Sequence, residues 1–208
     1  VAVIDTSGVV GRFIAETWGV DCNNFDPSGP PVDYIIVGAH DYNDVRNLGV
    51  PKNVRRFDPI LERVANGATL IVLENPGRWA ERLGAFDYAG VARAGLVSFG
   101  SSGRFFTGHD AVLTGLPQDC VMNWEYQAFY HGGESGLRLG RAGVETIVGI
   151  AGIRSWEIEN ALARVRYGSG MVLITTLPIL PGLASDAPQD ATVKRLFLNM
   201  LEYAGGNI

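Results

Sequence analysis

Short apolar runs alternate with helix-like patterns up to about residue 85, and this alternation restricts the fold more than any other feature of the sequence. The runs at 1–4, 34–38 and 69–73 are almost entirely aliphatic, as expected of strands that are covered on both faces. The segments between them repeat apolar residues every three or four positions, which is typical of one helix face. The order predicts an α/β fold: a doubly wound, mostly parallel sheet with helices on both faces.

One helix and its boundaries are especially well defined. Asp58 is a good N-cap, and Pro59 occupies the first helical position, where no backbone N–H is needed. Asn66 and Gly67 should end this helix. Its core-facing side chains are Ile60, Leu61 and Val64. Two weaker elements are expected, a short strand within 20–25 and a ragged helical turn within 41–48.

The second half predicts an added antiparallel hairpin. Strands at 163–167 and 171–176 are joined by a turn at Gly168-Ser169-Gly170. The first strand alternates Arg with apolar residues, so we expect one wet face and a place towards the sheet edge. The second strand is apolar throughout and should be central. Further expected elements are a bent strand or hairpin at 97–106, short strands at 127–131 and 145–150, and a last helix capped by Asp190.

Composition and charge exclude several classes of function. A net charge of -5 with scattered Lys and Arg argues against a nucleic-acid or membrane partner. No run is long enough to span a membrane. Cys22 and Cys120 have no metal-finger spacing, and we expect two free thiols rather than a disulfide. No cofactor motif is present, and we expect neither a cofactor nor a metal.

The chain lacks internal repeats and linkers, so we expect residues 1–208 to form a single domain. It begins directly with an apolar strand and has no initiator Met, which suggests a fragment of a longer chain or a processed one. The expected partners are then other domains of the same polypeptide, a second copy of the chain, or a carbohydrate. The compartment cannot be predicted from these residues.

Residues 68–83, ATLIVLENPGRWAERL, indicate a buried strand, a sharp turn and a short helix. In many α/β hydrolytic folds this elbow presents a nucleophilic Cys or Ser. Here it carries Glu74 and Asn75, which supply neither a thiol nor a hydroxyl. A carboxylate at Glu74 could act as a general acid or base, or could accept hydrogen bonds from the following helix.

Ligands of open α/β sheets bind beyond the carboxyl ends of the strands, where three loops should converge. Besides the elbow, these are the loop with Ser7 and the loop with His40, Asp41 and Asp44. Ser7 could help hold a phosphate or could simply cap a helix. His40 and Asp41 could act as acid and base or bind a metal, whereas the alternative is ordinary turn chemistry.

Aromatic residues cluster just before His131. Trp124, Tyr126, Phe129 and Tyr130 could stack against a sugar ring, or could pack the core beneath an irregular segment. Trp124, Tyr126 and His131 therefore join Ser7 and Asn75 as candidate ligand-binding residues.

Several segments together resemble the class I glutamine amidotransferase-like (flavodoxin-like) fold. They are YIIVGAHDYND, ILERVANGATLIVLEN, FTGHDAVLTGL, MNWEYQAFY, GMVLITTLPIL and VKRLFLNMLEYA. They look most like the degenerate domains of this type that are appended to bacterial family 2 and β-galactosidase-type glycoside hydrolases. The resemblance covers most of the chain, and the oxyanion-hole glycine of the family would correspond to the Gly38-Ala39 region.

The resemblance implies a domain without glutaminase activity. Members of the amidotransferase family carry a Cys on the elbow and a downstream His and Glu, whereas Glu74 and Asn75 occupy the elbow here. The resulting hypothesis is a non-catalytic domain of a carbohydrate-active enzyme, serving packing, oligomerisation or the shaping of a glycan cleft. Two alternatives stay open: a divergent hydrolase that uses Glu74 with His40 or Asp41, and a sugar- or nucleotide-binding module.

Overall fold

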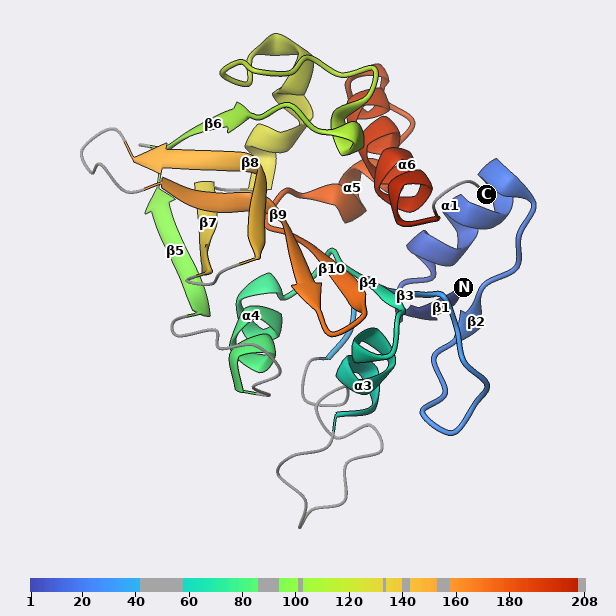
Figure 1. Ribbon diagram of the computed structural model, residues 1–208. Helices are drawn as coiled ribbons and strands as arrows, with labels where there is room; N and C mark the ends of the chain where they lie inside the picture. Colours follow the sequence, from blue (N-terminus) through green and yellow to red (C-terminus); the bar gives the residue numbers. More distant parts are fainter. Residues whose placement is uncertain are drawn as a thin grey trace.

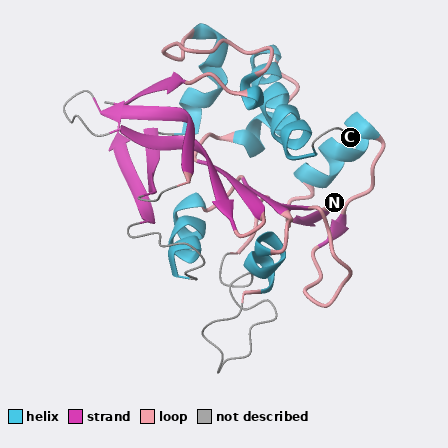
Figure 2. Ribbon diagram, viewed as in Figure 1, coloured by secondary structure: helices cyan, strands magenta, loops and turns pink. Residues whose placement is uncertain are grey.

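A computed structural model describes residues 1–41, 58–85, 94–100, 103–132, 134–139, 143–152 and 158–205 of the chain (Figure 1). One sheet of ten strands runs through it, and helices lie on both sides (Figure 2). The helical turn expected within 41–48, including Asp44, falls almost wholly outside the described residues.

Five strands form the parallel part of the sheet. Their order is β2 (Asn23–Asn24), β1 (Ala2–Ile4), β3 (Tyr34–Val37), β4 (Thr69–Val72) and β10 (Gly170–Thr175). All four neighbouring pairs are parallel. The predicted doubly wound α/β class is therefore confirmed, and the apolar strand β10 is central, as expected.

Each face of the parallel strands packs into its own core cluster. Ile36, Ile71 and Leu173 point into the cluster that includes residues of α1 (Val9–Trp18), α5 (Ile179–Leu183) and α6 (Ala191–Gly205). The alternate strand residues, such as Ile35, point towards α3 (Pro59–Ala65) and α4 (Pro76–Ala85). Because successive strand side chains face opposite ways, an unbroken aliphatic strand satisfies both clusters.

An antiparallel extension continues the sheet beyond β10. Strand β9 (Ile158–Tyr167) pairs with β10 and also with β8 (Val144–Gly152), which in turn pairs with β6 (Gly103–Thr107). The amino-terminal part of β9 reaches β7 (Glu134–Leu139), which pairs with β5 (Ala94–Gly100). The predicted hairpin is confirmed as β9–β10 with its turn at 168–169.

The expectation that this hairpin's first strand lies towards an edge is wrong. Val165 of β9 pairs with Val172 of β10 and with Val144 of β8, so β9 is an inner strand. Of its two arginines, Arg166 is exposed, as expected of a wet face, whereas Arg164 is largely buried. Arg164 forms ion pairs with Asp110 and Glu145, and its guanidinium lies 4.2 Å from the centre of the Tyr203 ring.

Two further expectations need correction. Residues 127–131 belong to the 3₁₀ segment η2 (Trp124–Gly132) and not to a strand. The segment 97–106 contains parts of β5 and β6, which pair with β7 and β8 rather than with each other. Asp190 does lie directly before α6, at the expected cap position, and it also ends a 3₁₀ turn, η3 (Pro188–Asp190). In η2 the buried rings of Tyr126 and Phe129 are three residues apart, which matches the 3₁₀ repeat.

The helix predicted after Asp58 is confirmed as α3. The Asp58 carboxylate accepts hydrogen bonds from the backbone N–H groups of Ile60 and Leu61 at 3.0 and 3.1 Å. A third short 3₁₀ segment, η1 (Ala111–Leu113), is capped in the same way by Asp110. In both cases the capping signal is local in the sequence, which is why it can be recognised there.

Candidate functional site

The carboxyl ends of β1, β3 and β4 bring the three predicted loops together. Backbone hydrogen bonds join Gly38 to Ile4 and Leu73 to Val37, each at 2.9 Å. Beyond these, Thr6 N–H donates to the carbonyl of Ala39 at 2.6 Å. The loops that carry Ser7, His40 and Glu74 therefore leave the sheet side by side.

Asp5 is the polar residue that organises this edge, and sequence reasoning missed it. Its carboxylate accepts hydrogen bonds from the Ser7 hydroxyl at 2.6 Å and from the backbone N–H groups of Ser7, Val10 and Ala39 at 2.8–3.1 Å. A β-carbon on Gly38 would lie 2.8 Å from Asp5 Cγ, so this contact requires glycine. An aspartate directly after a buried strand and before Thr-Ser-Gly was the signal available in the sequence.

This arrangement changes the role expected of Ser7. The N-cap of α1 is Gly8, with φ of 69°, and its first turn is held by the Asp5 carboxylate through Val10 N–H. Ser7 is exposed, donates to Asp5, and accepts a longer 3.3 Å bond from Val9 N–H. Since a carboxylate already lies at this helix start, a phosphate there would meet its negative charge.

The elbow has the sharp geometry that the sequence predicts. Asn75 adopts the left-handed conformation with φ of 52°, between β4 and α4. Its carbonyl accepts hydrogen bonds from Arg78 N–H and Trp79 N–H at 3.0 and 3.2 Å, which starts the helix. Glu74 and Asn75 are both half-buried. The chain thus keeps a strand–turn–helix elbow whose side chains are a carboxylate and an amide.

Neither cysteine lies on this elbow. Both thiols are free, as expected. Cys22 packs against the core cluster that contains α1, and burial raises the pKa of its thiol. Cys120 lies in a loop beside β6, and its backbone carbonyl accepts a hydrogen bond from Thr107 N–H of that strand. Because its raised pKa keeps the thiol protonated at neutral pH, Cys22 is a poor nucleophile.

His40 is held at the same edge by its backbone neighbour. Its Nδ1 lies 2.8 Å from the carbonyl oxygen of Gly38, and because a carbonyl oxygen can only accept, Nδ1 is the donor in this hydrogen bond. The imidazole meets the buried ring of Trp79 edge-on, with centroids 6.3 Å apart. Behind Trp79 lies Arg82, which forms a buried ion pair with Asp58.

The proposed acid–base partners do not form a bonded group. Among the described residues, no hydrogen bond or ion pair joins Glu74 to His40 or to the exposed Asp41. In the part of the chain that the structure describes, no three His, Cys, Asp or Glu side chains gather as a metal site. Within the same residues, no helix is long and apolar enough to cross a membrane.

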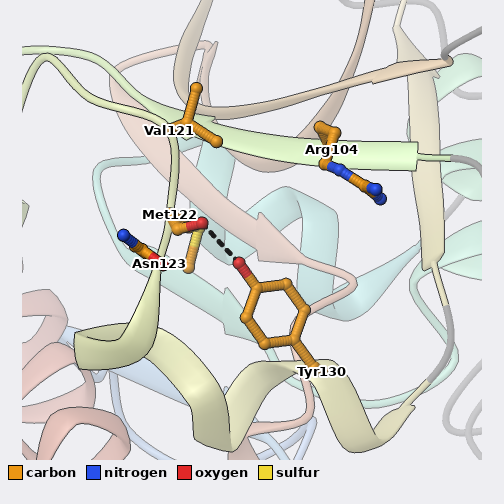
Figure 3. A pocket seen from close by; sticks show the side chains of 5 residues that line it. All are labelled: Arg104, Val121, Met122, Asn123 and Tyr130. Carbon is orange, nitrogen blue, oxygen red and sulfur yellow. Dashed lines mark hydrogen bonds between the residues drawn. The ribbon is translucent and has the colours of Figure 1, made fainter.

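The aromatic cluster divides into core and surface. Tyr126 and Phe129 are buried with their rings 6.1 Å apart, and the Tyr126 hydroxyl donates to the carbonyl of Pro117. By contrast, Trp124 is 78% exposed and Tyr130 is 41% exposed. Beside Tyr130 lies a surface cavity of about 430 Å³ (Figure 3). His131 lies in η2, and its side chain is outside what the structure describes.

The sequence matches no known protein family and no curated protein. Solved structures do share the fold. A cytoplasmic protein from Salmonella typhimurium LT2 has a TM-score of 0.55 at 12% identity, covering 97% of this chain and 87% of that one. A second Salmonella typhimurium cytoplasmic protein has a TM-score of 0.51 at 14% identity, covering 95% and 86%.

An exo-β-1,4-mannosidase from Opitutaceae bacterium strain TAV5 has a TM-score of 0.48 at 13% identity. This chain, 94% of which is covered, spans 30% of that enzyme's length. The two Salmonella structures show the fold alone. The resemblance to amidotransferase-like domains of glycoside hydrolases therefore stays a prediction.

Proposed function

We propose that this chain is a non-catalytic α/β domain with amidotransferase-like architecture, and that it serves a larger carbohydrate-active enzyme through packing, oligomerisation or the shaping of a glycan cleft. The observation that carries the proposal is the elbow. Asn75 keeps the left-handed backbone on which related hydrolytic folds present a nucleophile, with φ of 52°. Its side chain is an amide, which cannot form an acyl-enzyme.

The neighbouring polar groups support the same proposal, because most of them hold the loops together. The Asp5 carboxylate is occupied by four donors from its own and the adjacent loop. The Nδ1 of His40 is occupied by the carbonyl of Gly38. The link to carbohydrate metabolism rests on the sequence resemblance, which covers most of the chain.

A direct test measures ammonia release from glutamine and release of nitrophenol from a panel of nitrophenyl glycosides by the purified chain. We expect no turnover above a heat-denatured control. Turnover of either substrate class that Glu74→Gln removes would refute the proposal. Asn75→Ser serves as a matched variant, because it introduces the missing hydroxyl at the elbow and should still give no turnover without a base beside it.

A divergent hydrolase is the second candidate, and one observation favours it. The imidazole of His40, whose Nδ1 donates to Gly38, lies at the same edge as the half-buried Glu74. Such a histidine could serve as a general base. This candidate predicts that Glu74→Gln abolishes an activity while the melting temperature stays unchanged. A variant that only melts earlier would assign Glu74 to the structure of the turn.

A further inference from the structure

The cavity beside η2 is built from elements other than the carboxyl-edge loops. It lies between β6 and the segment that enters η2, and its lining residues are Arg104, Val121, Met122, Asn123 and Tyr130 (Figure 3). Pockets that bind small molecules combine apolar or aromatic surface with a few polar groups. This lining combines one aromatic ring, two apolar side chains, an amide and a guanidinium.

The Tyr130 ring is held in place before any ligand arrives. Its hydroxyl donates a hydrogen bond to the carbonyl of Met122 (Figure 3). The ring also packs against the buried Phe105, with centroids 6.1 Å apart. Tyr130 is still 41% exposed. Because its hydroxyl and its ring are both already held, it should lose little conformational entropy when a ligand binds.

The backbone around the ring is held as firmly. Met122 N–H donates to the carbonyl of Phe105 at 2.9 Å, and Val121 pairs with Phe106 of β6. Asn123 is fixed through its carbonyl, which accepts from Tyr126 N–H at 2.9 Å. The cavity is thus anchored to the edge of β6 on one side and to the start of η2 on the other.

Hydrogen-bonding groups flank the ring. In Figure 3, Asn123 and Arg104 lie on opposite sides of Tyr130. An amide donates and accepts, and a guanidinium donates from a fixed fork. A ligand that fits this arrangement has a flat C–H face for the ring and hydroxyl groups around its rim, which is the chemistry of a pyranose sugar. From this complementarity we infer that the cavity binds a pyranose unit of a glycan.

Two observations favour a sugar over other ligands. Arg104 is the single cation among the lining residues, whereas phosphate groups are usually bound by several donors or by a helix start. Trp124, next in sequence to Asn123, is 78% exposed and gives this part of the surface a second accessible aromatic side chain. The inference rests on the proposed function, since it gives the glycan-related role a particular surface.

The test is a saturation-transfer NMR titration of the 208-residue chain with methyl β-pyranosides of galactose, glucose and mannose. AMP and inorganic phosphate are the comparison ligands. We expect transfer to the ring C–H protons of at least one pyranoside. Tyr130→Ala should weaken that binding by about tenfold, the worth of a well-placed aromatic contact. Arg104→Gln and Asn123→Ala should each weaken it several-fold.

Val20→Ala is the matched control, because Val20 is exposed to a similar degree, 40%, but follows α1. It should bind the pyranoside like the parent chain. If Tyr130→Ala melts early, Arg104→Gln decides the question, because Arg104 is exposed and takes no part in the hydrogen bond to Met122 or the contact with Phe105 that hold the ring.

Several outcomes would overturn the inference. They are no pyranoside binding, binding that ignores Tyr130→Ala and Arg104→Gln, or binding of AMP alone. Concentration-dependent self-association that Tyr130→Ala removes would also overturn it and would assign the surface to a protein interface. Each of these results leaves the proposed function standing. Conversely, turnover in the hydrolase assays would refute the proposed function without affecting pyranoside binding at this cavity.

Discussion

Asp5 and Asn75 each hold a turn of the chain at the carboxyl edge of the sheet. Asp5 does so with its side chain, which gathers four donors from two loops. Asn75 does so with its backbone, at φ of 52°. Asparagine is among the few residues that tolerate this conformation, so its presence at the elbow has a structural explanation that is independent of catalysis.

Substitutions at Asn75 should follow this backbone requirement. We expect Asn75→Ala to lower the free energy of unfolding by about 1 kcal/mol, because a β-carbon disfavours the left-handed conformation. Asn75→Gly should stay within about 0.5 kcal/mol of the parent chain, since glycine adopts positive φ freely. Urea unfolding of both variants gives the comparison. Equal losses would show that the Asn75 side chain, rather than its backbone, stabilises the elbow.

Tyr126 should make the protein sensitive to alkaline pH. Burial raises the pKa of its phenol in the folded state. Below the ordinary tyrosine pKa of about 10, both states are protonated and its contribution is complete. Above that pH only the unfolded chain ionises freely, so we expect about 1 kcal/mol of stability to be lost by pH 11. Thermal melts from pH 8 to 11 measure the loss.

The control for this pH dependence is Tyr126→Phe. It removes the hydrogen bond to Pro117 and should therefore be less stable than the parent chain at neutral pH. Its stability should nevertheless decline less between pH 9 and pH 11. A decline as steep as that of the parent chain would place the alkaline sensitivity on another group.

At the scale of elements, local signals succeeded and long-range ones failed. Helix α3 begins where Asp58 and Pro59 predict, because capping involves the next three residues only. The place of β9 depends on β8, which begins 14 residues before it in the chain, and on the ion pairs of Arg164 with Asp110 and Glu145. An alternating pattern shows which face is polar, but not whether water or a partner side chain satisfies it.

The β9–β10 hairpin is docked on the end of α3, and this contact requires glycine. Ser169 N–H donates to the carbonyl of Ala65 at 2.8 Å. A β-carbon on Gly170 would lie 2.2 Å from the carbonyl oxygens of Val64 and Ala68. We expect Gly170→Ala to lower the free energy of unfolding by about 3 kcal/mol, because neither backbone can yield without moving α3.

Gly11→Ala is the matched control for that measurement. In α1 the added β-carbon would meet only Cys22 Cβ, at 3.9 Å. Alanine loses less backbone entropy than glycine in a helix, so this variant should be about 0.5–1 kcal/mol more stable. Both variants can be compared by urea unfolding. A small loss for Gly170→Ala would mean that the hairpin moves off α3 at little cost.

At the scale of the whole molecule, one sheet connects the two halves of the chain. Strand β10 is bonded to β4 on its parallel side and to β9 on its antiparallel side. The core cluster that contains α1 and α6 includes Ile71 of β4 and also Phe105 and Ile150 of the extension. The parallel and antiparallel parts therefore share a sheet and a core among the described residues.

This shared core predicts cooperative unfolding, which also tests the expectation of a single domain. Urea transitions followed by far-ultraviolet circular dichroism and by tryptophan fluorescence should coincide, with one midpoint. Two of the four tryptophans report from different environments: Trp79 is fully buried in the cluster with α3 and α4, and Trp124 is exposed in η2. Two separated transitions would divide the chain into independent units.

The sequence by itself determined the parallel α/β class, the boundaries of α3, the β9–β10 hairpin and the elbow without a nucleophile. These features depend on periodicity, capping and turn residues, which act over a few positions. Only the tertiary structure decided that β9 is an inner strand, that Asp5 closes the start of α1, and that Tyr130 is exposed while Tyr126 is buried. Each of these depends on partners distant in the sequence, because burial and hydrogen bonding are settled by the neighbours that folding brings into contact.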